Sequence, residues 1–407
     1  MASLSERSEI KRYEQNKKRK KIVSIGAFFT VVVAVIAGIL FYVLFQMNRT
    51  YGGYSVVEEV KRKDGMSVQY EIHGDTLLKY SKDGASALNT DGEILWNGSY
   101  DFKNPYAVTC GDYVAVADIG EKNICIFDGN GSGTELSVDG AIEQIAVAKQ
   151  GVVAAVLEND DEAKINIYDP YDATEKLKVS ISTSTDSDGY PVAIALSEDG
   201  QKLVTSYINI TNGVVCSSLN FYNFDSVGKN SMDRIVGSRP LEQEIVADVQ
   251  FLNSETVCGF TQKGFKLYKM RETPSDIVDI QVEENIKSVC YNSEYITLVL
   301  DNNDNKDKPY LVQVYNTSGK LVLEKPVSYA YDTVEMGKEE VIFYSASECH
   351  ILRLRGNEKL DCTFDENVSY FFPLSSAEKY ILIDSDTINQ VRLTGRKKHS
   401  GNMSRLK

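Results

Sequence analysis

The chain has 407 residues, 43% of them hydrophobic and 25% charged, a composition that excludes a wholly disordered protein. Its formal net charge of −14 argues against nucleic acid as a partner of the main body, since both are negatively charged. The positive charge is concentrated at the two ends. Residues 1–21 hold eight Lys or Arg and three acids, and residues 392–407 hold six Lys or Arg and no acid.

Residues 22–46 are predicted to form a transmembrane helix. Residues 22–45 (IVSIGAFFTVVVAVIAGILFYVLF) carry no charge, and about 20 apolar residues suffice to cross a bilayer. The preceding cluster KKRKK at 17–21 places the basic arm 1–21 in the cytoplasm and the rest of the chain outside. We therefore expect a single-pass protein of the cell membrane that contacts lipid through residues 22–46. A cleaved signal peptide is the alternative, but the apolar run exceeds the usual ~7–15 residues.

Beyond a short stalk at 47–53, strand patterns dominate up to residue 394. Short apolar runs are separated by Asp-Gly pairs that begin at Asp64, Asp83, Asp91, Asp128, Asp139, Asp188 and Asp199, which are typical of hairpin turns. No long segment has a helical period. The final stretch, 395–407, is polar and basic and is predicted to be a disordered tail.

A repeat of about 40–45 residues runs through this region. Its anchor is the end of an apolar strand, as in ICIFD (124–128), INIYD (165–169) and VQVYN (312–316). The anchor positions are 88, 127, 168, 222, 268, 315, 355 and 392, the first and the last two being degenerate copies. Four strands per repeat at this period predict an all-β propeller, with eight blades favoured and seven as the alternative.

The ends of the repeat region predict how the ring closes. The last unit supplies three strands, at 370–374, 380–384 and 388–393, whereas residues 54–61 (YSVVEEVK) form a spare strand just after the stalk. We expect this spare strand to complete the last blade. Closure in this way would remove the two open sheet edges.

No motif in the sequence names a reaction, so no catalytic, cofactor-binding or metal-binding residue is assigned and no cofactor is expected. The loop 301–307 (DNNDNKD) lacks the Gly and bidentate Glu of a calcium loop and is interpreted as a solvated hairpin loop. The glycine-rich residues 129–133 lack a following helix and are interpreted as an interstrand loop. His73, His350 and His399 are isolated in sequence and have no nucleophile motif nearby.

The chain has seven cysteines, an odd number. No two of them are spaced as CxxC, which argues against a zinc site. Most lie within apolar runs, so they are interpreted as small buried hydrophobic residues. One or two disulfides are the alternative in an oxidising compartment.

Several short sequence segments resemble those of known protein families. Residues 91–96 (DGEILW) resemble the Gly-x-x-x-Trp turn of quinoprotein-type and WD-repeat-like propellers, which include eight-bladed outer-membrane assembly lipoproteins, although the chain has a single Trp. Residues 80–84 (YSKDG), 189–200 and 220–224 (NFYNF) are similar to an uncharacterised family of single-pass, propeller-like proteins from Gram-positive, clostridia-type bacteria. The resemblance implies a membrane-anchored propeller of unknown function and carries over no catalytic residue.

The favoured function is therefore an extracytoplasmic interaction or scaffold module that binds a protein of the cell envelope. The alternative is a ligand-binding receptor or hydrolytic enzyme that uses the central funnel. Two carboxylates, or a His–acid pair, brought together in the funnel would favour the enzyme. A structural part of an envelope assembly machine is a third hypothesis, by analogy alone.

Overall fold

The computed structural model describes residues 12, 13, 17, 25, 28, 30–39, 41, 48–62, 65, 67–73, 75–159, 162–184, 188–211 and 213–395. It divides into two units, Met1–Thr50 and Tyr51–Lys407. Residues 30–39 of the first unit are helical. Among the described residues no helix has the length and apolarity needed to cross a bilayer. Much of the predicted span 22–46, most of the arm 1–21 and the tail after residue 395 lie outside the described residues.

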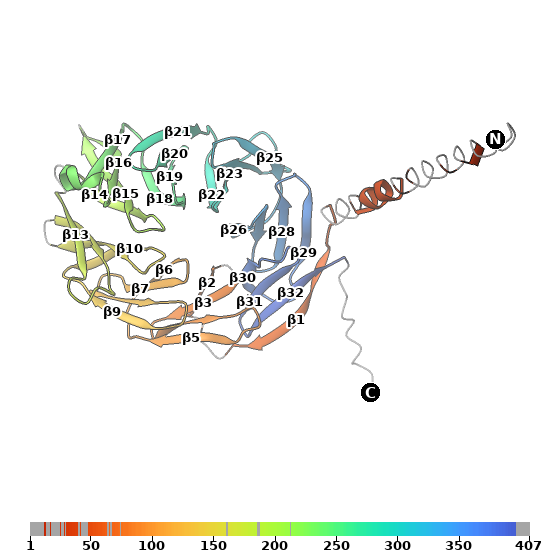
Figure 1. Cartoon of the computed structure of the whole chain (residues 1–407), viewed down its shortest axis with the longest axis horizontal. Coiled ribbons are helices and arrows are strands. Elements are labelled where there is room, and N and C mark those ends of the chain that lie inside the picture. Colours follow the sequence, from red (N-terminus) through yellow and green to blue (C-terminus); the bar gives the residue numbers. More distant parts are fainter. Residues whose placement is uncertain are drawn as a thin grey trace, which may run out of the picture. The chain divides into compact units, whose positions relative to one another are not determined.

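The described part of the second unit forms eight four-stranded antiparallel sheets arranged in a ring, as Figure 1 shows. Each sheet is one blade, and its first strand lies nearest the centre. The first strands of blades 1 to 8 are β2 (Gln69–His73), β6 (Pro105–Cys110), β10 (Ala141–Val147), β14 (Tyr190–Leu196), β18 (Val246–Asn253), β22 (Ile286–Tyr291), β26 (Thr333–Met336) and β30 (Val368–Pro373). The second strands are β3 (Thr76–Ser81), β7 (Tyr113–Asp118), β11 (Val153–Asn159), β15 (Lys202–Thr211), β19 (Thr256–Thr261), β23 (Tyr295–Asp301), β27 (Glu340–Tyr344) and β31 (Lys379–Asp384).

The third and fourth strands lie progressively further out. The third strands are β4 (Gly84–Leu88), β8 (Asn123–Phe127), β12 (Glu162–Tyr168), β16 (Val214–Asn223), β20 (Gly264–Met270), β24 (Tyr310–Asn316), β28 (Glu348–Arg353) and β32 (Thr387–Thr394). The fourth are β5 (Ile94–Ser99), β9 (Gly133–Ser137), β13 (Leu177–Ser184), β17 (Ile235–Leu241), β21 (Pro274–Gln281), β25 (Leu321–Val327), β29 (Glu358–Thr363) and β1 (Gly53–Lys61). Two 3₁₀ turns, η1 (Gly228–Asn230) and η2 (Met232–Arg234), precede β17. The eight-bladed prediction is confirmed.

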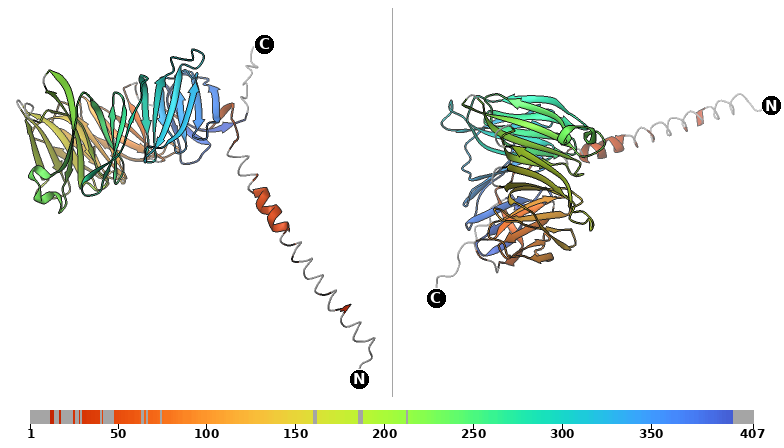
Figure 2. Two further views of the ribbon diagram at one scale, coloured as in Figure 1. Left: turned by 90° about the horizontal axis from the view of Figure 1, so that it is seen from above. Right: turned by 90° about the vertical axis from the view of Figure 1, so that its left-hand side faces the viewer.

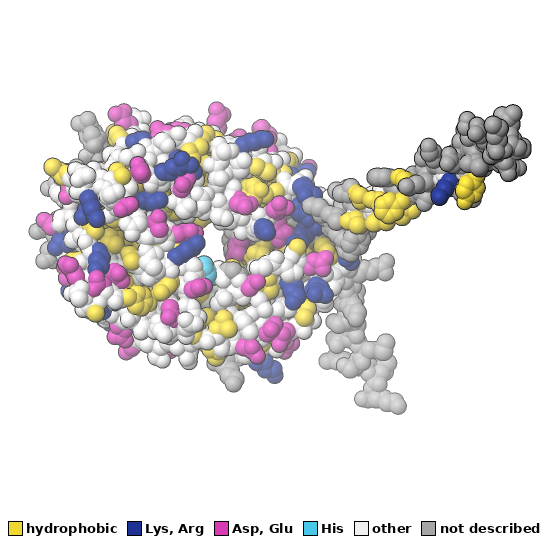
Figure 3. Space-filling view, in the orientation of Figure 1, with side chains coloured by type: hydrophobic (Ala, Val, Ile, Leu, Met, Phe, Trp, Pro, Cys, Tyr) yellow, Lys and Arg dark blue, Asp and Glu magenta, His cyan; other side chains and the backbone are white. Residues whose placement is uncertain are grey.

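Figure 2 gives the ring from its edge, where the strands run from one face to the other. Because neighbouring strands are antiparallel, the turns between first and second strands and those between third and fourth strands lie on one face. The turns between second and third strands lie on the opposite face. In the space-filling view of Figure 3 the ring is hollowed at its centre.

The core consists of eight hydrophobic clusters, one between each pair of neighbouring blades. The repeat anchors explain this arrangement. Each anchor packs against the preceding blade, as Tyr222 does, whereas the residue before it, such as Phe221, packs against the following blade. The last two residues of this pattern are therefore buried on opposite faces of the blade, whereas polar residues such as Asn220 and Lys266 occur earlier in the third strands.

Two degenerate anchors fall elsewhere than the sequence pattern predicts. In blade 7 the residue at the anchor position is Leu352, which packs against blade 6, whereas Arg355 lies in the turn after β28. In blade 8 it is Val391 and not the exposed Arg392. The pattern failed here because both copies have an aliphatic residue at the anchor position. Five of the other six copies have an aromatic residue there, and the sixth has Leu88.

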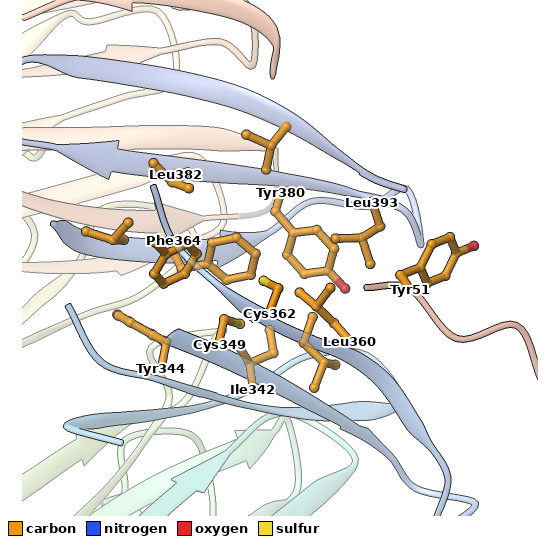
Figure 4. Packing of buried hydrophobic residues seen from close by; sticks show 14 residues of the cluster. Tyr51, Ile342, Tyr344, Cys349, Leu360, Cys362, Phe364, Tyr380, Leu382 and Leu393 are labelled. Carbon is orange, nitrogen blue, oxygen red and sulfur yellow. The ribbon is translucent and has the colours of Figure 1, made fainter. Parts of the chain in front are cut away.

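Strand β1 closes the ring, as predicted. It pairs with β32 from Gly53↔Thr394 to Lys61↔Thr387, with a bulge between Val56 and Glu58. The ring in fact begins earlier, inside the predicted stalk 47–53. Tyr51 is 5% exposed and its backbone N–H donates to the carbonyl oxygen of Lys359 on β29 at 2.8 Å. Figure 4 shows Tyr51 in the cluster between blades 7 and 8, which also contains Cys349 and Cys362.

Candidate functional site

A cavity of about 700 Å³ lies against the first strands of blades 1 to 5. Its walls are formed mainly by residues of β2, β6, β10, β14 and β18, the strands nearest the centre of the ring. The polar lining residues are Gln69, His73, Asn104, Tyr106, Thr109, Glu143, Gln144, Glu198, Asp248 and Gln250. Cavities of this size and mixed lining are typical of small-ligand sites in proteins.

Two carboxylates of the cavity lie on different blades and have different neighbours. On β10, Glu143 occupies the bulge between Ile142 and Gln144, and burial together with the Glu158 carboxylate raises its pKa. On β18, Asp248 accepts hydrogen bonds from the side-chain amide of Gln250 at 3.1 and 3.3 Å, and burial raises its pKa. A raised pKa means that the ionised form lacks compensation from positive charge.

A Glu–Tyr pair recurs on blades 1 and 7. The Tyr344 hydroxyl on β27 donates to Glu335 on β26 at 3.3 Å. The Tyr80 hydroxyl on β3 lies at the same distance from Glu71 on β2, but its shorter hydrogen bond, at 2.6 Å, is to Gln69. Burial raises the pKa of Glu71, and it raises the pKa of Glu335 to about 7. Glu335 therefore changes its charge near neutral pH.

The histidines do not join a carboxylate in the cavity, within the described residues. His73 lines the cavity, and its Nδ1 lies 3.3 Å from Thr109 Oγ1. His350 lies on β28 in the third strand of blade 7, 3.4 Å from Asp361, and its ring stacks on that of Tyr329 at a centroid distance of 4.4 Å. His399 lies outside the described residues. A His–acid pair, one of the two arrangements that would favour an enzyme, is thus not among the contacts of the described cavity residues.

The two loops singled out by the sequence connect strands, as predicted. Residues 302–309 join β23 to β24, and Asp301 contacts Lys287 at 3.1 Å. Residues 128–132 join β8 to β9, and a Cβ on Gly131 would lie 2.3 Å from the Cβ of Trp96. No group of three or more metal-binding side chains occurs among the described residues, and the seven cysteines are free thiols.

Blade 4 carries a second candidate site, an extended hairpin. Strands β15 and β16 have ten residues each and pair from Lys202↔Asn223 to Thr211↔Val214. Their neighbours are shorter, since β14 pairs only as far as Ile208 and β17 only as far as Ser217. Residues 209–211 and 213–216 therefore extend beyond the paired ends of β14 and β17. Ile210, Val214 and Val215 on this projection are 74%, 43% and 42% exposed.

The hairpin tip and the chain exits lie on opposite faces of the ring. The tip joins a second strand to a third strand. Strand β1 begins at Gly53, and the chain leaves the ring after Thr394 at the end of the third strand β32. Gly53 and Thr394 are paired with each other. In antiparallel strands the start and the end of a third strand lie on opposite faces of the ring. The apolar tip is at the start of a third strand and the chain exits are at the end of one, so the tip faces away from both exits.

The sequence did contain a signal for this hairpin. The spacing of 54 residues between Tyr168 and Tyr222 is the longest in the repeat, and the added length lies in β15 and β16. The carboxylates of the cavity gave no comparable signal, because a single acid on an innermost strand is not distinguishable in sequence from an acid on a solvated one.

A family model described as "Family of unknown function (DUF5711)" matches residues 47–393. No curated protein matches the sequence. Among solved structures, BamB from Moraxella catarrhalis is similar with a TM-score of 0.52 and 10% identity, covering 84% of this chain and all of that one. At this identity the likeness supports the propeller fold alone.

Two weaker likenesses involve other propellers. The Pan2 WD40 domain of Neurospora crassa has a TM-score of 0.46 at 10% identity and covers 85% of this chain and 99% of that one. Sqt1 of Chaetomium thermophilum, solved bound to the N-terminus of the ribosomal protein L10, has a TM-score of 0.46 at 13% identity, covering 86% and 99%.

Proposed function

Since the chain belongs to the DUF5711 family, whose function is unknown, we propose from its geometry that it is a membrane-anchored propeller that binds an envelope protein. In this proposal residues 22–46 anchor the chain in the cell membrane, with residues 1–21 in the cytoplasm and the propeller outside. The uncharged run of 24 residues and the basic cluster before it support this topology.

The observation that carries the interaction function is the extended hairpin of blade 4. Three apolar side chains are exposed on a projection whose backbone is held by the strand ladder. Exposed apolar residues on a rigid element are a common feature of protein-binding surfaces. The hairpin also lies on the face of the propeller opposite the chain exits, where the ends of the ring do not obstruct a partner.

Site-specific photo-crosslinking in cells tests this role. A photoreactive amino acid at Ile210 is expected to capture one discrete protein. The matched control is Met232 in η2, which is 86% exposed, belongs to the same blade and lies on the opposite face. Capture of the same proteins from both positions, or of none from Ile210, would contradict a binding role for the hairpin.

The topology is tested separately by fractionation and protease accessibility. We expect the full chain to sediment with membranes and to resist extraction by alkaline carbonate. Protease added to cells stripped of their wall should digest the propeller and leave a fragment containing the N-terminus. Protection of the propeller in intact stripped cells would overturn the orientation.

A further inference from the structure

The central cavity is lined by several side-chain oxygens that accept hydrogen bonds. The side-chain NH₂ of Gln144 donates to the carbonyl oxygen of Val192, and that of Gln250 donates to Asp248. The carbonyl oxygen of each glutamine remains an acceptor, and the NH₂ of Gln144 keeps a second N–H donor. The carboxylates of Glu143 and Asp248 add further oxygens, which only accept when ionised.

The cavity also has negative charge that the protein does not neutralise. None of the residues that line it, all of them within the described part of the chain, is a lysine or arginine. Glu198 is paired with Lys149 at 2.8 Å, but the ion pairs of the described residues include neither Glu143 nor Asp248.

Two poorly solvated acids elsewhere in the protein are paired with lysines. Glu340, with a side chain that is 12% exposed, contacts Lys359 at 2.6 Å, and Glu244, which is 16% exposed, contacts Lys266 at 3.0 Å. Such pairing is the general expectation, since a buried charge without a partner is costly. Among the ion pairs of the described residues, Glu143 and Asp248 have no such partner, and neither do Glu71 and Glu335 on two other first strands.

An aromatic ring completes the lining. Tyr106 on β6 is 49% exposed although it belongs to an innermost strand. A ring face in such a position can contact the methylene groups or the charge of a cationic ligand. A metal ion fits less well, because no group of three or more metal-binding side chains occurs in the described part of the chain.

We propose that the central cavity binds an alkylammonium group, carried either by a free polyamine or by a lysine side chain of a peptide. An ammonium group has three donors and no acceptor, which complements the oxygens of Glu143, Gln144, Asp248 and Gln250. Its charge would supply the missing counter-ion. This site is independent of the hairpin and of the membrane anchor.

Isothermal titration calorimetry of the purified full-length chain in mild detergent tests the proposal. Spermidine and Nα-acetyl-lysine amide are the probes, and Nε-acetylated lysine amide is the uncharged control. We expect heat from at least one of the two amines at constant ionic strength and none from the acetylated compound. Binding by spermidine alone identifies the polyamine source, whereas binding by the lysine derivative identifies a peptide side chain.

Charge-removing variants locate the site. Asp248→Asn and Glu143→Gln are each expected to weaken binding about tenfold, equivalent to ~1.4 kcal/mol. Both should keep or raise the thermal midpoint, because each removes a poorly solvated ionised group. The matched control is Glu175→Gln, which removes one exposed negative charge outside the cavity. Unchanged affinity in both cavity variants, an equal loss in Glu175→Gln, or equal heat from the acetylated compound would overturn the proposal.

Discussion

At the residue scale, the same side-chain types play different roles according to which strand of the blade they occupy. The third-strand anchors such as Tyr168 and Tyr268 fill the gaps between blades. Acids on four first strands instead have pKa values that burial raises, namely Glu71, Glu143, Asp248 and Glu335. Each of these four acids is the third residue of its strand, and the four strands belong to blades 1, 3, 5 and 7.

Glu335 gives the propeller a stability term that depends on pH. Its folded-state pKa of about 7 lies above the ordinary value of 4.5, so the folded state binds the proton more tightly than the unfolded state. This stabilising contribution is fully present below about pH 4.5 and is lost as the pH rises through 7, in total about 3 kcal/mol. Glu335→Gln should therefore unfold at a higher midpoint than the wild type at pH 8, with a smaller difference at pH 5.

Urea denaturation of both proteins at the two pH values measures this effect. Glu71→Gln is the matched control, since Glu71 holds the equivalent tyrosine contact on blade 1 and its pKa rises for the same reason. The control should show the same sign with a smaller amplitude. A pH-independent difference between Glu335→Gln and the wild type would show that Glu335 does not titrate in this range.

At the scale of elements, the sequence predicts strands better than it predicts their ends. Residues 54–61 were recognisable as a spare strand because the last unit had only three. Tyr51 was assigned to the stalk because the contact that buries it, with β29, joins residues far apart in the sequence. No local pattern reports such a contact. The cavity carboxylates were missed for a related reason, since only the closed ring brings their strands together.

Truncation measures what the closing element contributes. Removal of residues 1–50 should leave the stability of the ring unchanged, because Tyr51–Lys407 is a separate unit. Removal of residues 1–62 deletes Tyr51 and β1, exposes the edge of β32, and should prevent cooperative folding. Equal urea midpoints for the two truncations would contradict closure by β1.

A point substitution separates the contributions of Tyr51 and of β1. In the chain lacking residues 1–50, Tyr51→Ala should cost about 3 kcal/mol by leaving a cavity between blades 7 and 8. Tyr51→Phe should cost about 1 kcal/mol, because it removes only the hydroxyl that donates to Glu378 at 2.6 Å. Urea denaturation of the two variants measures both losses, and equal losses would show that the ring of Tyr51 contributes nothing by packing.

At the scale of the whole molecule, eight similar interfaces close into a ring whose two ends meet in one blade. The blade count followed from the repeat period, whereas the exact anchors of blades 7 and 8 needed the pairing of strands. Neither the blade count nor the anchor positions predict the function. Propellers with similar blades differ in their loops and cavities, and these determine what each one binds.

Since Gly53 pairs with Thr394, the natural ends can be joined. A circular permutant with a linker of about six residues between Gly395 and Tyr51, and with new ends between Asp304 and Asn305, should fold with a stability within ~1 kcal/mol of the chain lacking residues 1–50. The new ends fall in an exposed loop between β23 and β24. Circular dichroism and urea denaturation test this, and an unfolded permutant would show that the ring requires its natural break in blade 8.

The position of that break has a mechanical consequence. A load applied through residue 50 would act first on Tyr51 and its contacts with β29, and then on the Gly53 end of β1. In an antiparallel pair loaded at a single end, the hydrogen bonds break in succession rather than all together. Tension on an anchored molecule would thus separate β1 from β32 while the other seven blades stay intact. The ring would open in blade 8 and could re-form when the load is removed.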